Sequence, residues 1–235
     1  HYNYDNILYD LYIEKFNLNN FLKINILNKL NDRAGASGLC NYGNTCYINS
    51  VLQCLSNTID LTKYFLLKFY ANDINTGNKI GSNGRFSEAY SNFIDSMWSD
   101  ENNNELEYRL KKFLQIFFGC QKIIVIQGEQ QDAQEFLSIV LDLLHEDLNR
   151  ISNKPYIELE EQKENESDSE ASERWWDSHK KREDSIIVDL FHGQYKSKIT
   201  CNVCGKSSIT YDRFMILGLP IPQAYDKIEL KFLVD

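Results

Sequence analysis

Three of the chain's six cysteines lie in one short stretch, "SGLCNYGNTCYINSVLQCLSN", which covers residues 37–57. The apolar positions after Cys46 have the i, i+3, i+4, i+7 spacing of a helix: Ile48, Val51, Leu52 and Leu55. A thiolate is a good nucleophile, and a helix N-terminus favours a nearby negative charge by about 0.3–1 kcal/mol. Cys46, in the first turn, is therefore a candidate nucleophile. The alternative is a core residue, since a free cysteine is usually buried, and full activation needs a neighbouring imidazole.

Asn41 lies five residues before Cys46, on a loop in which one glycine and two asparagines favour a tight, irregular path. Its side-chain amide could donate a hydrogen bond to the oxygen of a tetrahedral intermediate. Together with the Cys46 N–H group, it could form an oxyanion hole. We predict that Cys40, Cys54 and Cys120 are packing residues rather than reactive thiols.

Composition limits the classes of function that the chain can have. An apolar fraction of 43% is enough for a real core, and a net charge of −9 argues against general binding to nucleic acids or anionic membranes. The N-terminus, "HYNYDNILYD", has neither a signal peptide nor an initiator Met, so we expect a piece of a longer protein. Six cysteines without a secretory signal indicate a reducing compartment, the cytoplasm or the nucleus, and no disulfide framework.

Helical patterns occupy most of the chain up to about residue 150. We expect an amphipathic helix in "FLKINILNKL", a loop over residues 72–84, and helices around Phe86–Met97 and Leu106–Phe117, the latter with Lys111 and Lys112 on its outer face. The clearest pattern is "QQDAQEFLSIVLDLLHEDL", with Asp132 as N-cap.

The last part of the chain has a different character. Residues 158–173 carry eight acidic residues and one lysine, so we expect a disordered insertion, either a plain solvated loop or an acidic docking segment. From Ser185, two stretches rich in β-branched and aromatic residues flank "CNVCG" and predict two strands that meet at a Cys-X-X-Cys turn. Helices followed by strands indicate an α+β fold.

Three boxes in this order resemble the ubiquitin-specific proteases, a family of deubiquitinases. "GLCNYGNTCYINSVLQCLSN" is similar to the cysteine box of the family, "QGEQQDAQEFLSIVLDLLHEDL" to its glutamine-aspartate box, and "DSIIVDLFHGQYKSKITCNVCGKSSITYDRFMILGLPIP" to its fingers region. The stretch "WWDSHKKREDSIIVDLFHGQYKS" is most similar to the subgroup with a large insertion in the catalytic domain.

The resemblance implies a papain-like cysteine protease fold with a helical thumb, β fingers and a palm that lies largely outside this chain. The expected segments are an N-terminal linker or helical extension (1–33), the N-terminal part of the catalytic domain (34–235), a thumb (about 38–150) and fingers (about 185–222). The remainder of the catalytic domain is expected on another segment.

The resemblance also assigns roles to residues. Cys46 matches the nucleophile and Asn41 the oxyanion residue, while Gln131 and Asp132, flanked by Gln130, match the box that lines the cleft for the ubiquitin tail. A carboxylate at Asp132 could hold an arginine of that basic tail with charge-assisted hydrogen bonds. The residue could equally be a plain helix N-cap, or serve both purposes.

Two parts of the family pattern are not matched. The catalytic His and its Asp or Asn partner have no counterpart, and we expect none of His1, His145, His179 and His192 to be the base. Cys201 and Cys204 match half of a four-cysteine zinc site, and two thiolates alone do not close such a site. A structural zinc is therefore possible only with further ligands, and catalysis itself needs no cofactor.

These observations predict a thiol-dependent deubiquitinase that acts on ubiquitin and ubiquitinated proteins, with no nucleic-acid or membrane partner. One alternative is a catalytically incomplete or inactive module that still binds ubiquitin. Another is a redox module on Cys201 and Cys204, which the strands on either side disfavour, because a redox Cys-X-X-Cys normally opens a helix.

Overall fold

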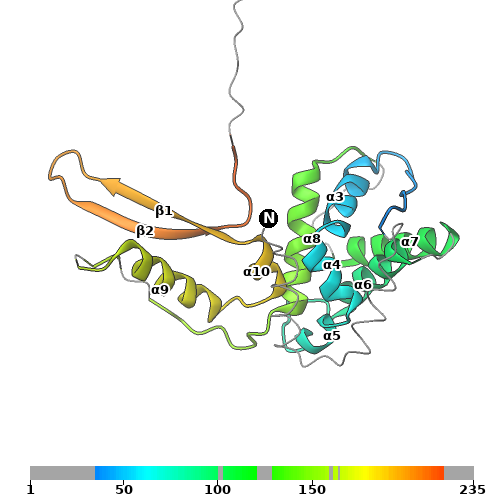
Figure 1. Ribbon diagram of the computed structural model, residues 1–235, viewed down its shortest axis with the longest axis horizontal. Coiled ribbons are helices and arrows are strands. Elements are labelled where there is room, and N and C mark those ends of the chain that lie inside the picture. Colours follow the sequence, from blue (N-terminus) through cyan, green and yellow to red (C-terminus); the bar gives the residue numbers. More distant parts are fainter. Residues whose placement is uncertain (1–34, 100–102, 121–128, 159–160, 164, 220–235) are drawn as a thin grey trace, which may run out of the picture.

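The computed structural model describes residues 35–99, 103–120, 129–158, 161–163 and 165–219. The helix expected in "FLKINILNKL" and the extension over residues 1–33 lie outside this part of the chain. Figure 1 shows a group of helices at one side and, at the other, a long two-stranded hairpin with one helix beside it. The predicted α+β class is confirmed.

The helical group contains six of the described helices. They are α3 (Cys46–Ser56), α4 (Ile59–Leu66), α5 (Tyr70–Asp73), α6 (Arg85–Trp98), α7 (Asn103–Cys120) and α8 (Ala133–Leu148). Four of them were expected from their periodicity, whereas α4 and α5 were not. Lys111 and Lys112 lie exposed on the outer face of α7, as predicted.

Aromatic side chains fill the core between these helices. Phe86 on α6 packs against Phe113 on α7 with ring centroids 5.2 Å apart, and Phe117 reaches Phe136 on α8 at 4.9 Å. Tyr47 on α3 meets Phe136 edge to face at 5.5 Å. Such contacts add to the burial energy of the rings. They fix the start of α3 beside the first turns of α8.

A buried carboxylate ties the loop before α6 to the end of α8. Asp147 is fully buried and accepts hydrogen bonds from Ser82 N (2.6 Å), Ser82 Oγ (2.7 Å) and Ser87 N (3.1 Å). The backbone oxygen of Asp147 accepts a further bond from Asn75 N at 2.8 Å. The carboxylate therefore supplies acceptors to the N-terminal turn of α6, where backbone N–H groups have no partner within the helix.

The hairpin consists of β1 (Gly193–Thr200) and β2 (Ser207–Phe214), paired antiparallel from Gly193 opposite Phe214 to Thr200 opposite Ser207. The expectation that the first strand begins at Ser185 was wrong. Residues Ile186–Phe191 form a short helix, α10, whose N-cap Ser185 accepts a bond from Val188 N. The first three residues of α10 are buried, and a short apolar run of this kind fits a buried helix as well as a strand.

The expected disorder of residues 158–173 was wrong from residue 168 onward. Helix α9 spans Asp168–Lys180 and begins with a capping box between Ser167 and Glu170. Acidic residues at and just before its start have basic partners: Arg174 on α9 binds Glu166 at 2.7 Å, and Lys196 on β1 binds Asp168 at 2.6 Å. Acids in a first helical turn also favour the helix, so a high acidic content did not prevent folding here.

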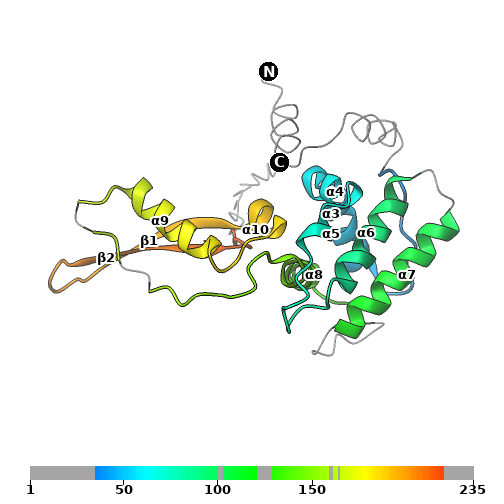
Figure 2. The same ribbon diagram turned by 90° about the horizontal axis from the view of Figure 1, so that it is seen from below.

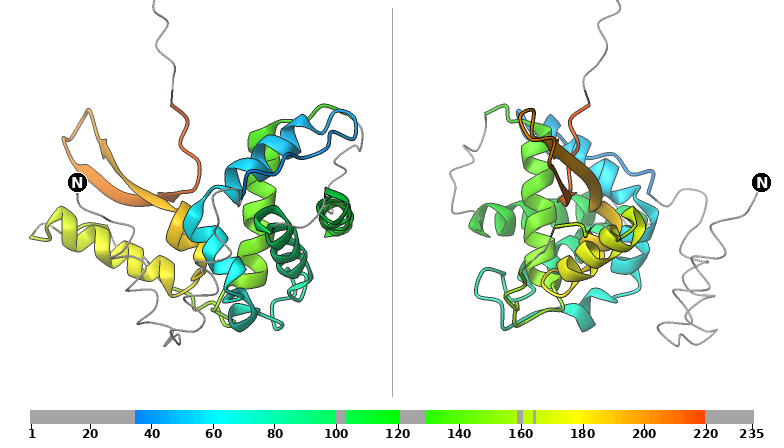
Figure 3. Two further views of the ribbon diagram at one scale, coloured as in Figure 1. Left: turned by 45° about the vertical axis from the view of Figure 1, so that its right-hand side comes forward. Right: turned by 90° about the vertical axis from the view of Figure 1, so that its left-hand side faces the viewer.

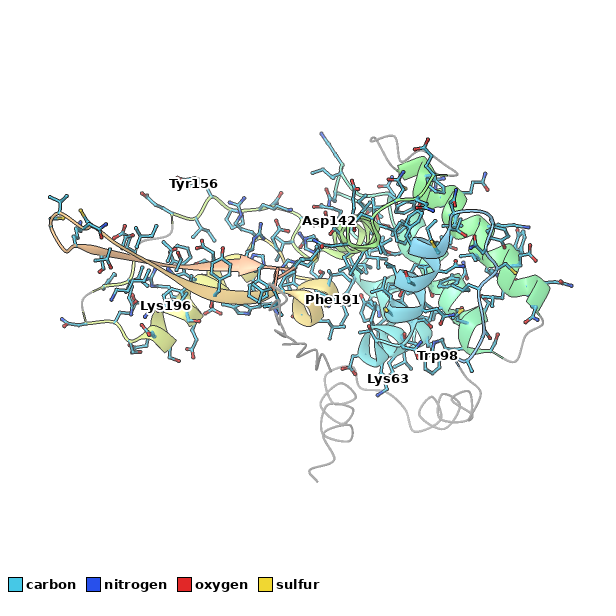
Figure 4. All side chains as sticks on the ribbon, turned by 90° about the horizontal axis from the view of Figure 1, so that it is seen from above. Lys63, Trp98, Asp142, Tyr156, Phe191 and Lys196 are labelled. Atoms are coloured by element: carbon cyan, nitrogen blue, oxygen red, sulfur yellow. The ribbon has the colours of Figure 1, made fainter. Side chains whose placement is uncertain are left out.

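Helix α8 joins the two parts of the structure. Figures 2 and 3 show α10 against α8, with α9 running along the hairpin away from the helical group. In Figure 4, Phe191 at the end of α10 lies between the two parts, and Lys196 lies further out on the hairpin. None of the described helices is long and apolar enough to cross a bilayer.

Candidate active site

Cys46 is the first residue of α3, and its side chain is exposed. The N-cap residue, Thr45, makes no side-chain capping bond to the helix. Its Oγ1 instead accepts a bond from Tyr42 N and donates one to Asn41 Oδ1, each at 3.0 Å. The Thr45 hydroxyl therefore leaves the N–H groups of the first turn to a ligand at the helix N-terminus.

The side chain of Asn41 is held in a defined orientation. Besides the Thr45 hydroxyl, its Oδ1 accepts hydrogen bonds from Gly43 N (2.9 Å) and Thr45 N (3.3 Å). Three donors converge on one atom, which identifies it as the oxygen, because an amide nitrogen would face donors with its own hydrogens. These three bonds occupy the oxygen of the carboxamide and do not use its Nδ2 group, which is the donor that an oxyanion hole requires.

The loop itself has an unusual backbone. Gly43 has a φ of 92° and Asn44 a φ of 51°, so two successive residues are left-handed, a conformation that Gly and Asn tolerate best. Asn49 on α3 donates from Nδ2 to the backbone oxygens of Cys40 (3.1 Å) and Leu39 (3.4 Å) and ties the loop to the helix. The role of Asn49 was not predicted from the sequence, although an amide one turn after Cys46 on a largely apolar helix indicates a polar contact.

The glutamine-aspartate box begins α8 at the same end of the helical group as Cys46 (Figure 1). Asp132 is the N-cap, as predicted: its Oδ1 accepts bonds from Gln134 N (2.6 Å) and Glu135 N (3.3 Å). Asp132 and Gln130 are exposed and Gln131 is half-buried. Both capping bonds end on Oδ1. The helix cap therefore does not use Oδ2 of this exposed carboxylate, and a cationic ligand can bind there.

Cys201 and Cys204 lie exposed at the turn of the hairpin, as predicted. Gly205, with a φ of 73°, donates from its N to Cys201 O at 2.9 Å, and Cys201 N donates to Lys206 O at 2.8 Å. Hydrogen bonds from the backbone of Cys204 and Val203 lower the pKa of the Cys201 thiol. This tight Cys-X-X-Cys turn, here called a knuckle, is suited to bind a metal ion through two thiolates. Within the described residues, no group of three or more potential ligands completes a metal site.

The three described histidines lie where the C-terminal half of α8 meets α9, α10 and the start of the hairpin, a region that we call the joint. His145 is buried and contacts Ser185 Oγ at 2.8 Å and Glu183 Oε2 at 2.7 Å. His179 and His192 stack and share a 3.2 Å contact between Nε2 and Nδ1. Since Phe136 packs beside the start of α3, His145 lies about 13 Å further along α8 at 1.5 Å per residue. These positions support the expectation that none of the three is the base for Cys46.

The packing role predicted for Cys40 and Cys54 was wrong, because both side chains are exposed. Cys54 lies on the face of α3 that is turned away from the core, although its neighbours Leu52 and Leu55 in the sequence are buried. Cys120 is half-buried and packs against the core, as expected. All six thiols are free in the structure.

Two surface pockets, of about 370 and 290 Å³, lie around the joint rather than at Cys46. Their walls include His179 and Arg213 in the larger pocket, and His145 and His192 in the smaller one. Neither wall includes a residue of the 37–57 segment. The chemistry of the site therefore rests on Cys46 and its loop, not on these pockets.

An exposed cysteine at a helix N-terminus, with an asparagine carboxamide fixed on the same loop, is the arrangement expected of a thiol hydrolase of the cysteine protease class. Comparison with known proteins makes this class specific. The sequence profile of the family Ubiquitin carboxyl-terminal hydrolase matches residues 37–223. The chain belongs to this family.

Relatives with similar sequences carry the same name. The chain is 44% identical over 204 residues to Ubiquitin carboxyl-terminal hydrolase 4 of Mus musculus, covering 85% of this chain and 20% of the mouse protein. It is 42% identical over 208 residues to Ubiquitin carboxyl-terminal hydrolase 15 of Homo sapiens, covering 87% of this chain and 20% of the human protein. The chain thus spans about a fifth of the length of these relatives.

Solved structures of the same fold include two of the SAGA DUB module of Ubp8, Sgf11, Sus1 and Sgf73. The one bound to monoubiquitin gives a TM-score of 0.54 at 21% identity, over 78% of this chain and 35% of that one. The one bound to ubiquitin aldehyde gives a TM-score of 0.51 at 23% identity, over 78% and 34%. The predicted papain-like fold of the ubiquitin-specific proteases is confirmed, whereas the predicted domain boundaries stay predictions.

Proposed function

We propose that this chain carries the nucleophile and oxyanion site of a thiol-dependent deubiquitinase. The enzyme cleaves the isopeptide or peptide bond after the C-terminal glycine of ubiquitin. The observation that carries the proposal is the pairing of exposed Cys46 at the start of α3 with the oriented carboxamide of Asn41. Family membership over residues 37–223 supports ubiquitin as the substrate.

In the proposed reaction, the Cys46 thiolate attacks the carbonyl carbon of the terminal glycine. The resulting oxyanion accepts hydrogen bonds from the Cys46 N–H and from Asn41 Nδ2. The C–N bond then breaks, the leaving amine takes up a proton, and a thioester remains on Cys46. Water hydrolyses this thioester and restores the thiol. We assign the proton transfers to a histidine outside the described residues, since the described histidines lie at the joint with the hairpin.

Asp132 fits the role of a binding residue for the ubiquitin tail. It is exposed at the start of α8, at the end of the helical group that also presents Cys46, and its Oδ2 is not used by the helix cap. Gln130 and Gln131 precede it on the same turn. A guanidinium of a basic peptide would form a charge-assisted pair with this carboxylate.

The test uses ubiquitin with a C-terminal alkyne electrophile and the complete protein that contains this chain. Intact mass should rise by one ubiquitin in the wild type and stay unchanged in Cys46→Ala. Cys54→Ala, which removes another exposed thiol of α3, is the matched control and should retain the adduct. Binding of ubiquitin without any adduct in the wild type would favour an inactive binding module instead. The oriented amide of Asn41 argues against that module, since binding alone does not need it.

We also propose that Cys201 and Cys204 hold half of a structural zinc site. The exposed Cys-X-X-Cys turn at the end of the hairpin supports this role, and a closed site needs two further ligands from elsewhere in the complete protein. Metal analysis of the complete protein should give one zinc per chain, and the double variant Cys201→Ser, Cys204→Ser should lose it. Full retention of zinc in that variant would contradict the assignment. A role in the cytoplasm or nucleus, where thiols stay reduced, agrees with six free cysteines.

A further inference from the structure

Tyr42, next to Asn41 on the loop, is held by a charged pair on a different helix. Lys111 Nζ on α7 lies 5.1 Å from the centroid of the Tyr42 ring, a cation–π distance. Glu107, one turn earlier on α7, lies close enough for its negative charge to raise the pKa of Tyr42. Glu107 and Lys111 bind each other, with Nζ and Oε1 2.7 Å apart. The cation of this ion pair therefore lies over the face of the Tyr42 ring.

The Tyr42 ring stays neutral in this arrangement. Partial burial and the negative charge of Glu107 raise the pKa of Tyr42 to about 12, while the bond to Lys111 lowers the pKa of Glu107. A neutral phenol ring therefore faces the ammonium group of an ion pair that stays charged, which is the arrangement that a cation–π contact requires.

The loop needs an external support of this kind. Its own hydrogen bonds, those of Asn41 and Thr45, fix its internal shape, and Asn49 ties its beginning to α3. Its middle is exposed: a Cβ added at Gly43 would meet no heavy atom within 4 Å. Tyr42 adds a contact with α7, beside which the segment leading to α3 runs in Figures 1 and 2.

We propose that Tyr42 is a positioning residue, through which Glu107 and Lys111 of α7 hold the Asn41 carboxamide where the oxyanion forms. The inference rests on the proposed function, because it concerns the same reaction. Tyr42 itself touches no reacting atom in this scheme. Its importance follows from the geometry of catalysis, in which a displacement of about 1 Å can cost up to 100-fold in rate.

The test measures hydrolysis of a ubiquitin C-terminal fluorogenic amide by the complete protein. Tyr42→Ala should lower kcat by about 3- to 30-fold with KM changed less than about twofold, since a positioning loss acts mainly in the transition state. Tyr42→Phe keeps the ring under Lys111 and should retain most of the wild-type kcat. Lys111→Ala removes the cation and should fall between wild type and Tyr42→Ala, and Lys111→Arg should restore kcat because the cation remains. Lys112→Ala, a change at the neighbouring exposed lysine, is the matched control and should equal the wild type.

A double-mutant cycle separates positioning from a general effect on folding. If Tyr42 acts through Asn41, Tyr42→Ala should have no further effect on kcat in an Asn41→Ala background. An equal loss in both backgrounds, or wild-type kcat in Tyr42→Ala, would overturn the inference. Thermal midpoints accompany every variant, and the surface variants of Lys111 keep the test decisive if Tyr42→Ala does not fold. Failure of the proposed function has a different signature: the wild type would then release no fluorophore beyond the Cys46→Ala background.

Discussion

Asp132 combines two roles that substitutions can separate. The structure establishes it as the N-cap of α8, through bonds from Gln134 N and Glu135 N to its Oδ1. The proposed function assigns its charge to the arginine of a bound ubiquitin tail. Asparagine has almost the same capping ability as aspartate but no charge, whereas alanine has neither. Asp132→Asn should therefore remove the binding role and leave the cap in place.

The size of each effect follows from the contacts. Loss of an N-cap costs about 1 kcal/mol, which corresponds to a Tm decrease of about 2–4 °C for a chain of this length. Asp132→Ala should show that decrease, and Asp132→Asn should lie closer to the wild type. A hydrogen bond to a charged group contributes about 1.5–3 kcal/mol, and 1.4 kcal/mol is a factor of ten. Both variants should therefore lower kcat/KM for a ubiquitin amide by about 10- to 100-fold.

The assay pairs thermal denaturation with steady-state kinetics on the same preparations. Glu135→Gln is a suitable control, because it changes a neighbouring exposed acid in the first turn of α8. It should leave kcat/KM within about twofold of the wild type. If Asp132→Asn keeps wild-type kcat/KM, the carboxylate does not hold the ubiquitin tail and Asp132 is a helix cap only. If Asp132→Asn loses as much stability as Asp132→Ala, the separation of roles is wrong.

Three further predictions concern the loop, the core and the joint. Asn41→Ala should lower kcat by about 100- to 1,000-fold in steady-state assays, as expected for removal of one oxyanion donor, and unchanged kcat would contradict that role. Asp147→Ala leaves the N–H groups of Ser82 and Ser87 without their acceptor. At about 1–3 kcal/mol for the buried Ser87 donor, and less for the partly buried Ser82 donor, it should lower Tm by about 4–12 °C or somewhat more in calorimetry. An equal Tm would show that water replaces the carboxylate. Burial and nearby Arg213 lower the pKa of His179 from 6.5 to about 4. Between these two pH values the unfolded chain binds more protons than the folded chain, so the free energy of unfolding should fall as pH drops from 6.5 to 4. Urea unfolding of His179→Gln should show a shallower decline over this window, and an identical decline would exclude His179 as the source.

Local sequence signals predicted the elements that carry the site because those elements are locally determined. Helix α3 begins at Cys46 and α8 begins after Asp132, as expected, since periodic apolar residues and an N-cap act within a few turns. Helix α10 was misread as a strand because Ile186–Phe191 is too short and too apolar to show either period. Helix α9 was misread as disordered because its acids are stabilised by basic partners from other segments, such as Lys196 on β1.

Contacts between distant segments explain what the sequence could not predict in the site. The roles expected of Cys46 and Asn41 depend on a stretch of six residues, and the hydrogen bonds that orient Asn41 all lie within it. The support of Tyr42 by Lys111 joins residues 69 positions apart, and it exists only because α7 packs beside the loop. The spacing of apolar residues in the sequence cannot reveal such a contact, because Tyr42 and Lys111 both have the character of ordinary surface residues.

Helix α8 gives the site its larger geometry. Its N-cap is Asp132, its first turn packs Phe136 against Tyr47 beside the thiol, and its last turns bind Ser185, the N-cap of α10, through His145. A helix of 16 residues spans about 24 Å, and packed helices deform little. The separation between the thiol and α10, which leads into the hairpin, is therefore set by one rigid element rather than by a loop. Under the proposed function, a substrate that touches both ends must match that length, which a folded protein can do and a short peptide with the same C-terminal residues cannot.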